Sequence, residues 1–245
     1  MTHDNPGTVL VTGAGRRLGR AIALDFANRG WRVGVHCHSS SAEAAELVAE
    51  IQRSGRKAAV FAADLGQLDA LGPLIEACVE ALGPPTCLIN NAARFGWDTL
   101  ATVDGESWRG HLDVNLRAPI FLTQAFAKAL PKDKTGNVIN LIDQKVLQLD
   151  PGYFSYTIAK AALWTATQTM AQALGPGIRV NAIAPGPVLK SEGQSQASFE
   201  REVRATLLQK PVDEADVTSA IRFLIDTPSI TGQMIALDAG QHLAR

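Results

Sequence analysis

The chain has 245 residues and a formal net charge of −1, from 23 basic and 24 acidic side chains that are spread along its length. This balance, without a basic patch, argues against a nucleic-acid-binding protein and against a membrane-surface protein. Three cysteines without C-x-x-C spacing imply neither a disulfide framework nor a zinc site, and reduced thiols fit a cytoplasmic protein.

Targeting segments are not expected either. The N-terminus is polar and has no apolar stretch of the kind that a secretory signal needs. No apolar run approaches the roughly 18 residues that span a bilayer, so we expect no membrane partner.

Short apolar runs alternate with amphipathic segments throughout the chain. The runs predicted to form strands are 8–12, 31–36, 57–62, 87–90, 138–142, 179–183 and 233–237. The segments predicted to form helices are 21–28, 41–54, 67–82, 113–130, 156–174 and 213–226. Because no repeat or linker interrupts them, they predict one α/β domain over residues 1–245, a Rossmann-type, doubly wound parallel sheet of about seven strands. The polar segment 190–209 is predicted to be a mobile flap over the substrate.

A glycine-rich turn separates the first predicted strand from the first predicted helix. Its glycines, Gly13, Gly15 and Gly19, permit a tight turn and a close backbone approach to a ligand. Backbone N–H groups and the positive end of the helix then lie where a pyrophosphate can bind. The alternative is a plain turn, but the strand and the helix on either side favour a dinucleotide site.

A tyrosine and a lysine stand four residues apart, at Tyr156 and Lys160, in a segment of helical character. This spacing places both side chains on one face of a helix. At roughly 5 Å and an effective dielectric of about 20, the ammonium stabilises a phenolate by about 3 kcal/mol, so we expect a lowered pKa for Tyr156. Such a phenol suits general acid catalysis. The alternative is an amphipathic helix with both side chains at the surface.

Asp143 lies thirteen residues before the tyrosine and directly follows the fifth predicted strand. Ligands of open α/β sheets bind at the carboxyl ends of the strands. We therefore expect Asp143 in the same site as Tyr156, although a strand-end carboxylate in solvent is the alternative.

Taken together, these motifs resemble the short-chain dehydrogenase/reductase family. The family's pattern is met, in order and approximate spacing, by Thr12-Gly13 with Gly19, Asp64, Asn90-Asn91-Ala92, Asn115, Tyr156 with Lys160, and Pro185-Gly186. The match runs from about Val9 to the C-terminus and is weakest in segment 190–209.

Two departures narrow the resemblance. Arg17 stands where the glycine turn usually has its middle glycine, and Asp143 stands where a catalytic serine is usual. Both are similar to the pteridine reductase branch, which includes enzymes that reduce dihydromonapterin and dihydrofolate. The segment His36-x-His38-x-Ser40, Phe95 and the ending Leu237-Asp-Ala-Gly-x-His-Leu are similar to that branch as well. Because the usual serine is absent, a catalytically inactive protein is the alternative interpretation.

The cofactor that this pattern implies is NADPH. The second predicted strand runs into His36-Cys37-His38-Ser39-Ser40, with no carboxylate before Glu43 to hold the 2′-hydroxyl of NAD, and its neutral and basic donors suit a 2′-phosphate. Ser39 departs from the arginine that is frequent there in pteridine reductases. No further ligands cluster near the two histidines, so no metal is expected.

The residues expected at the cofactor are Gly13, Gly15, Arg17, Leu18, Gly19, His36, His38, Ser39, Ser40, Asp64, Leu65, Asn91, Ala92, Tyr156, Lys160, Pro185 and Gly186. By resemblance Asp64 faces the adenine, and capping of the third helix is its alternative or additional role.

The resemblance also implies the catalytic roles. Tyr156 is expected to donate a proton, Lys160 to bind the nicotinamide ribose, and Asn115 to link Lys160 to solvent through a water or a backbone kink. In ketone reduction an ionised Asp143 repels the oxygen that becomes negative. A carboxyl there fits a cyclic imine better, because it can bond ring N–H groups or help to pass a proton to nitrogen.

The residues expected at the substrate are Arg17, Phe95, Asp143 and Tyr156. Phe95 resembles the aromatic residue that stacks a pterin against the nicotinamide, and ordinary loop packing is its alternative role. Trp97 and Leu189 are further candidates because they lie close to these motifs in the sequence.

We therefore expect an NADPH-dependent reductase that transfers hydride to the C=N bond of a pterin-like substrate. A carbonyl or 3-ketoacyl reductase of the same fold, and a non-catalytic NADP-binding sensor, are the alternatives. The resemblance implies a homotetramer, with interfaces on the helices around Phe121 and Trp164.

Overall fold

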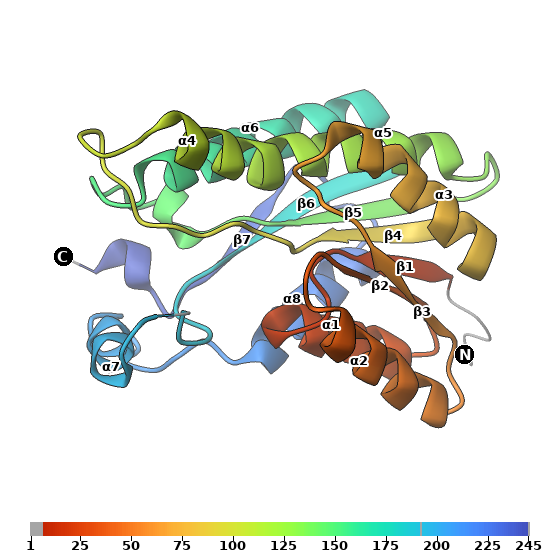
Figure 1. Cartoon of the computed structure of the whole chain (residues 1–245), viewed down its shortest axis with the longest axis horizontal. Coiled ribbons are helices and arrows are strands. Elements are labelled where there is room, and N and C mark those ends of the chain that lie inside the picture. The colour runs from red at the N-terminus through yellow and green to blue at the C-terminus, as the bar shows by residue number, and fades with distance from the viewer. Residues whose placement is uncertain (1–6, 192, 245) are drawn as a thin grey trace.

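A computed structural model describes residues 7–191 and 193–244 of the chain, which form a three-layered α/β domain (Figure 1). Seven parallel strands lie in the order β3-β2-β1-β4-β5-β6-β7. The strands are β1 (Thr8–Val11), β2 (Arg32–Cys37), β3 (Ala58–Ala62), β4 (Pro85–Asn90), β5 (Gly136–Leu141), β6 (Ile178–Pro185) and β7 (Met234–Leu237). This arrangement confirms the predicted doubly wound sheet.

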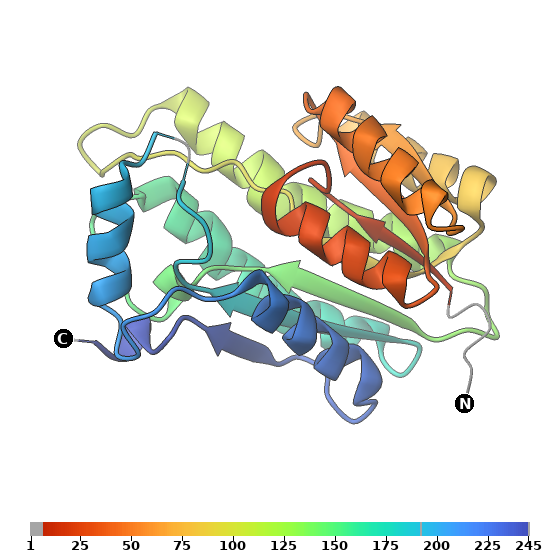
Figure 2. The same ribbon diagram turned by 90° about the horizontal axis from the view of Figure 1, so that it is seen from below.

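Helices cover both faces of the sheet (Figure 1). One face carries α1 (Arg17–Asn28), α2 (Ser41–Arg53) and α8 (Glu214–Asp226). The other face carries α3 (Leu71–Leu82), α4 (Gly105–Leu112), α5 (Ala118–Ala129) and α6 (Phe154–Leu174). The remaining helix, α7 (Gln196–Arg204), stands beyond the strand ends, away from the helices of either face (Figure 2). The strand order reverses between β1 and β4, and this reversal is where such sheets bind ligands.

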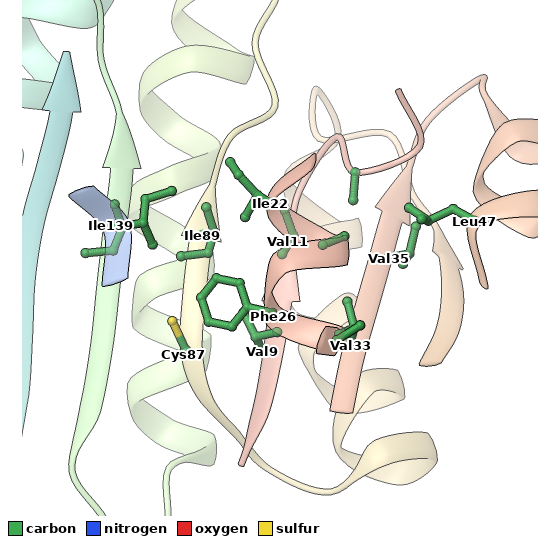
Figure 3. Packing of buried hydrophobic residues seen from close by; sticks show 14 of the residues in the cluster. Val9, Val11, Ile22, Phe26, Val33, Val35, Leu47, Cys87, Ile89 and Ile139 are labelled. Atoms are coloured by element: carbon green, nitrogen blue, oxygen red, sulfur yellow. The ribbon is translucent and has the colours of Figure 1, made fainter. Parts of the chain in front are cut away.

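The core consists of two apolar layers, one on each face of the sheet. Inward side chains of β1 and β2, such as Val9, Val11, Val33 and Val35, pack under α1 against Phe26 (Figure 3). On the opposite face a second cluster packs under α3 and α5. Because a central parallel strand is buried on both faces, its sequence is a nearly continuous run of apolar residues. This is why the short apolar runs predicted the sheet.

Some elements differ from their predicted form. The helix predicted over 113–130 is broken by a π-helical turn, Asp113–Arg117, before α5 begins. Residues 68–70 form a separate 3₁₀ turn, so α3 starts only at Leu71. The segment 190–209 contains the ordered helix α7, whose start is capped by Ser195: its Oγ accepts from the Ser198 N–H at 3.2 Å.

Residues 1–6, 192 and 245 lie outside the described part of the chain. They include the polar N-terminus, from which no secretory signal is predicted, and one residue of the predicted flap. Within residues 7–191 and 193–244, no helix combines the length and the apolar character that a bilayer span requires.

Candidate active site

A cavity of about 1190 Å³ opens at the carboxyl ends of the strands and is bounded on one side by the segment that leads into α7. Most of the predicted site residues line it. They are Gly13, Arg17, Leu18, Gly19, His36, His38, Ser39, Ser40, Asp64, Leu65, Asn91, Ala92, Phe95, Asp143, Tyr156, Lys160, Pro185, Gly186 and Leu189. Gly15, Trp97 and Asn115 are not part of its lining. The cavity exceeds the space that one drug-sized ligand needs, so it has room for a dinucleotide and a second molecule.

The glycine turn between β1 and α1 is held against the end of β4. Thr12 Oγ1 accepts the backbone N–H groups of Asn91 and Ala92, each at 3.0 Å, and Asn91 Nδ2 donates to Thr12 O at 2.8 Å. Gly13 has a φ of +62°, and a Cβ there would stand 3.0 Å from Ala92 Cα. A Cβ on Gly15 would stand 2.8 Å from Ser40 Oγ. The turn therefore fits a pyrophosphate that approaches bare backbone at the start of a helix.

Arg17 occupies the left-handed region, with a φ of +54°, that a glycine would adopt without strain. Its guanidinium donates to Lys190 O at 2.8 Å and to Leu189 O at 3.3 Å. The side chain thus joins the glycine turn to the segment that leads into α7. A glycine at this position could not make that connection.

His36 differs from its predicted role as a donor to the cofactor. Its Nδ1 accepts from the Gly13 N–H at 3.0 Å, and its Nε2 lies 3.1 Å from Ala63 O. The ring therefore carries its proton on Nε2 and has no N–H left for a phosphate. Burial lowers the pKa of His36 to about 4. The polar donors that remain beside it are His38, Ser39 and Ser40, of which the first two are exposed.

Two further parts of the cavity wall are rigid turns. Asp64 Oδ1 accepts from the Gly66 N–H at 2.8 Å, so this carboxylate closes a turn after β3 and does not cap α3. Gly186 donates its N–H to Leu237 O at 2.9 Å, and a Cβ there would stand 2.7 Å from Asp238 Cα. Only a glycine allows β6 to leave the sheet this close to the C-terminal segment.

The predicted catalytic side chains meet at the centre of the cavity. Tyr156 Oη donates to Asp143 Oδ2 at 2.9 Å. Lys160 Nζ donates to Leu141 O at 2.7 Å and lies 5.8 Å from the centroid of the Tyr156 ring. Tyr156 and Lys160 are buried, so neither lies on the outer face of α6. A phenol, a carboxylate and an ammonium thus share one pocket.

The expected lowering of the Tyr156 pKa by Lys160 is wrong for this arrangement. Burial, together with the charge and the acceptor oxygen of Asp143, raises the pKa of the phenol well above its usual value. Burial also raises the pKa of Asp143, although the Lys145 N–H, the Lys145 charge and the phenol oppose this. Burial lowers the pKa of Lys160 to about 8, against the attraction of Asp143. The phenol is therefore a neutral hydrogen-bond donor.

Asn115 lies in the π-helical turn and holds the chain that follows β4. Its Oδ1 accepts from the Arg94 N–H, and its Nδ2 donates to Arg94 O, both at 2.8 Å. The side chain is fully buried. The predicted link from Asn115 through solvent to Lys160 stays a prediction.

An aromatic wall stands beside the catalytic pair. Phe95 is 43% exposed and stacks on Tyr153, with ring centroids 4.6 Å apart and an interplanar angle of 18°. Phe95 also meets the Tyr156 ring edge-on at 4.9 Å. Tyr153 was not among the predicted site residues, although its position three residues before Tyr156 indicates that it lies close to the site.

A second feature that was not predicted is a buried cluster that caps α6, the helix that carries Tyr156 and Lys160. Tyr153, at the N-cap position of α6, makes no side-chain cap. Asp98 supplies one from 57 residues away, because its Oδ1 accepts the Ser155 N–H at 3.0 Å and its O accepts the Phe154 N–H at 3.2 Å. Ser155 Oγ donates to Asp98 Oδ2, and His111 Nδ1 lies 2.6 Å from Ser155 Oγ. Ser155, the residue before Tyr156, is thus held by three contacts: one through its N–H and two through its hydroxyl.

Comparisons with known proteins agree with this geometry. The sequence profile of the short chain dehydrogenase family matches residues 7–201. A 3-oxoacyl-[acyl-carrier-protein] reductase from a Synechocystis strain is 32% identical over 244 residues, which cover 98% of each chain.

Solved structures are similar over nearly the whole chain. The FolM alternative dihydrofolate reductase 1 from Brucella canis, complexed with NADP, has 45% identity and a TM-score of 0.96, with 100% of this chain and 97% of that chain covered. A short chain dehydrogenase from Burkholderia cenocepacia in complex with NADP has 30% identity and a TM-score of 0.90, with 95% and 96% covered.

The tertiary cap generates a first prediction. Replacement of Asp98 by Ala leaves the buried N–H and hydroxyl of Ser155 without their carboxylate acceptor, so we expect the free energy of unfolding to fall by about 2–4 kcal/mol. Urea denaturation measures this loss. The matched control is Asp104→Ala, because Asp104 caps the surface helix α4 through Glu106 and Ser107. Its expected cost is smaller, because this cap lies at the surface and water can replace the lost acceptor. Equal costs for the two variants would contradict the role of Asp98.

The buried histidine generates a second prediction. His36 binds a proton below pH 6.5 in the unfolded chain but only near pH 4 in the folded chain. Its contribution to stability is therefore fully present above pH 6.5 and is lost as the pH falls towards 4, by up to about 3 kcal/mol. Urea denaturation at pH 7 and pH 4.5 should show a smaller loss for His36→Gln than for the unaltered chain. Replacement of the exposed His38 by Gln should leave the loss unchanged.

Proposed function

The chain belongs to the short-chain dehydrogenase family, and we propose that it uses NADPH to reduce the C=N bond of a dihydropterin or dihydrofolate. The chain is an NADP-dependent short-chain reductase, like the NADP-complexed structures that it resembles over nearly its whole length. The further proposal, that the substrate is a nitrogen heterocycle, rests on a single observation. This is the carboxylate of Asp143, bonded to the phenol of Tyr156 at 2.9 Å.

The argument from Asp143 is electrostatic. Reduction of a ketone places negative charge on oxygen, and enzymes stabilise such charge with donors or positive groups. A partly buried carboxylate that accepts two hydrogen bonds, from Tyr156 and from the Lys145 N–H, offers the opposite polarity. Reduction of an imine instead needs a proton at nitrogen. A carboxyl with a raised pKa, bonded to a phenol, is suited to hold and supply that proton.

The proposed reaction adds one hydride and one proton. Bound NADPH supplies the hydride, which adds to the carbon of the C=N bond. Tyr156 passes its proton to the nitrogen, and Asp143 or solvent restores it. Lys160, held by Leu141 O, is proposed to bind the nicotinamide ribose and to balance the charge of Asp143 with its ammonium.

The walls of the cavity suit a flat heterocycle. Phe95 presents an aromatic ring at van der Waals distance from the Tyr156 ring and remains 43% exposed. A flat ring that reaches Tyr156 can therefore stack on Phe95. Arg17 and Leu189 also line the cavity, and the Arg17 guanidinium holds the segment before α7. We propose that this segment and α7 cover the substrate.

Reduction of a 3-oxoacyl thioester is the second candidate, because several sequence relatives, among them the Synechocystis protein, are named as such reductases. The position of Asp143 opposes it for the electrostatic reason given above. A non-catalytic NADP-binding sensor is the third candidate, and it predicts cofactor binding without turnover.

The homotetramer stays a prediction of the family resemblance. Phe121 on α5 is 38% exposed, and Trp164 on α6 is partly buried. The two helices lie on the same face of the sheet (Figure 1), so one interface between subunits could use both side chains.

A substrate panel tests the proposed function. NADPH consumption is followed with 7,8-dihydropterins, dihydrofolate and a 3-oxoacyl thioester in parallel. We expect turnover of the dihydropterin class, and Tyr156→Phe and Asp143→Ala should each lower kcat by about 10²-fold or more. NADPH affinity of the variants, measured by fluorescence titration, is the control for folding. Turnover of the thioester alone would contradict the proposal.

The pH dependence of the rate tests the role of Asp143 separately. Its pKa is raised, so its proton is present at low pH and is lost as the pH rises. We expect kcat/KM to fall with rising pH through this raised pKa and again near pH 8, where Lys160 loses its charge. In Asp143→Asn the first fall should disappear. The second should move to lower pH, because the carboxylate that raises the Lys160 pKa is gone. An unchanged first fall would assign it to another group.

A further inference from the structure

The buried side chain of His111 has three neighbours at the edge of the site. This imidazole, on the last turn of α4, is only 2% exposed, and its Nδ1 lies 2.6 Å from Ser155 Oγ. Its ring meets the Tyr156 ring at an angle of 77°, with centroids 6.1 Å apart. An added Cβ on Gly96, in the loop after β4, would stand 3.2 Å from Nε2. His111 therefore packs against both that loop and the first turn of α6.

The direction of the hydrogen bonds follows from the single proton of the Ser155 hydroxyl. That proton is donated to Asp98 Oδ2, so Ser155 Oγ can only accept from His111. The neutral imidazole consequently carries its proton on Nδ1 and has a lone pair on Nε2. Within residues 7–191 and 193–244 no group donates to this Nε2. Donation thus runs one way, from His111 through Ser155 to Asp98.

Ser155 is the point at which this chain of bonds reaches the proposed reaction. Asp98 Oδ1 accepts the Ser155 N–H at 3.0 Å, and the Ser155 hydroxyl is held as well, so its backbone and its side chain are both fixed. Tyr156 is the next residue, and its Oη donates to Asp143 Oδ2 at 2.9 Å. Because a hydrogen bond weakens steeply when its angle departs from linearity, a rotation of the first turn of α6 would weaken this bond.

Packing alone does not account for an imidazole at this place. Burial lowers the pKa of His111, the charge of Asp98 opposes this, and the charge of Arg94 adds to it, so the ring is neutral near pH 7. A buried Nε2 without a donor costs free energy that an apolar side chain of similar size would not cost. Side chains that cost stability are expected where function requires them. We therefore expect His111 to serve the reaction.

We propose that His111 is a positioning residue for the reduction, because through Ser155 it holds the Tyr156 phenol in the orientation that proton transfer requires. Neither His111 nor Ser155 lines the cavity, so neither contacts the substrate. The inference rests on the proposed role of Tyr156 as proton donor, but not on which double bond is reduced. A misplacement of about 1 Å at a reacting group can lower a rate about 10²-fold, so a smaller displacement of the phenol has a measurable effect.

Three substitutions of His111 separate its donor from its volume. His111→Asn keeps an N–H donor at the place of Nδ1, His111→Gln places its amide near Nε2, and His111→Leu has no donor. We expect His111→Gln and His111→Leu to lower kcat about tenfold, with the dissociation constant of NADPH within about twofold of that of the unaltered enzyme.

His111→Asn is the matched control, and it should retain most of kcat because it keeps the bond to Ser155. The substrate is dihydrofolate or, if only the 3-oxoacyl thioester of the panel is turned over, that thioester. Equal kcat values for His111→Asn and His111→Gln would overturn the proposal. If His111→Leu does not fold, this pair still decides the question.

A double-mutant cycle with Tyr156 distinguishes positioning from general support of the fold. His111→Leu should lower kcat about tenfold in the unaltered enzyme but less than about twofold in Tyr156→Phe, where no phenol remains to be oriented. Equal losses in the two backgrounds would overturn the proposal, because His111 would then act on the fold and not on the phenol.

A spectroscopic measurement decides the orientation without turnover. The chain has two tyrosines, Tyr153 and Tyr156, so tyrosine labelled with carbon-13 at Cζ gives two resonances, which Tyr153→Phe assigns. The Tyr156 resonance depends on the hydrogen bond that its Oη donates. We expect this resonance to move more in His111→Gln and His111→Leu than in His111→Asn.

Equal shifts of the Tyr156 resonance in all three variants, or no shift in His111→Leu, would overturn the positioning role. This outcome is distinct from a failure of the proposed function. An unaltered enzyme that turns over no compound of the panel would contradict the proposed function, and the resonance would still decide the role of His111.

Discussion

The hydrogen bond between Tyr156 and Asp143 is the interaction on which the rest of the site depends. A carboxylate, a phenol and an ammonium are all withdrawn from water within one pocket, and each is costly to bury alone. Tyr156 donates to Asp143, Leu141 O accepts from Lys160, and the opposite charges of Asp143 and Lys160 attract, which makes the burial tolerable. The same burial raises the proton affinity of Asp143 and lowers that of Lys160. The pocket therefore holds its proton on the oxygen atoms of Asp143 and Tyr156, which line the cavity.

Such a pocket requires rigid support, and the support comes from distant parts of the chain. Tyr156 and Lys160 share α6, but the first turn of α6 is capped by Asp98 from the loop after β4. Asp143 leaves β5 and bonds the N–H of Lys145. The glycine turn is fixed by Thr12 on one side and by His36 on the other. Each of these contacts joins two elements at the carboxyl end of the sheet. The site is thus a property of that edge and not of one motif.

The sequence predicted the sheet well because its strands are buried on both faces and read as apolar runs. It also predicted that Asp143 and Tyr156 meet, since one follows a strand and the other begins a helix at the same edge. It predicted the Tyr156 pKa in the wrong direction. Spacing along a helix gives the attraction to Lys160 but says nothing of burial, which dominates here. The cap by Asp98 had no local signal, because its partner lies 57 residues away. His36 was misread for a related reason: its two partners, Gly13 and Ala63, come from the segments that follow β1 and β3.

The chain is similar both to 3-oxoacyl reductases and to a dihydrofolate reductase. These similarities are consistent with each other if different residues of the site bind the cofactor and the substrate. We propose that the glycine turn and Lys160 bind the cofactor, and neither role depends on which bond is reduced. Asp143 follows β5 and bonds Tyr156 at 2.9 Å, so its exchange for a hydroxyl would change the polarity of the pocket that it shares with Tyr156 and Lys160. Arg17 is a second local difference. Its backbone adopts the left-handed conformation, and its side chain links the glycine turn to the segment before α7. On the proposed function, one scaffold serves oxygen and nitrogen acceptors because the groups that choose between them, Asp143 and Arg17, are few and lie at the carboxyl edge of the sheet.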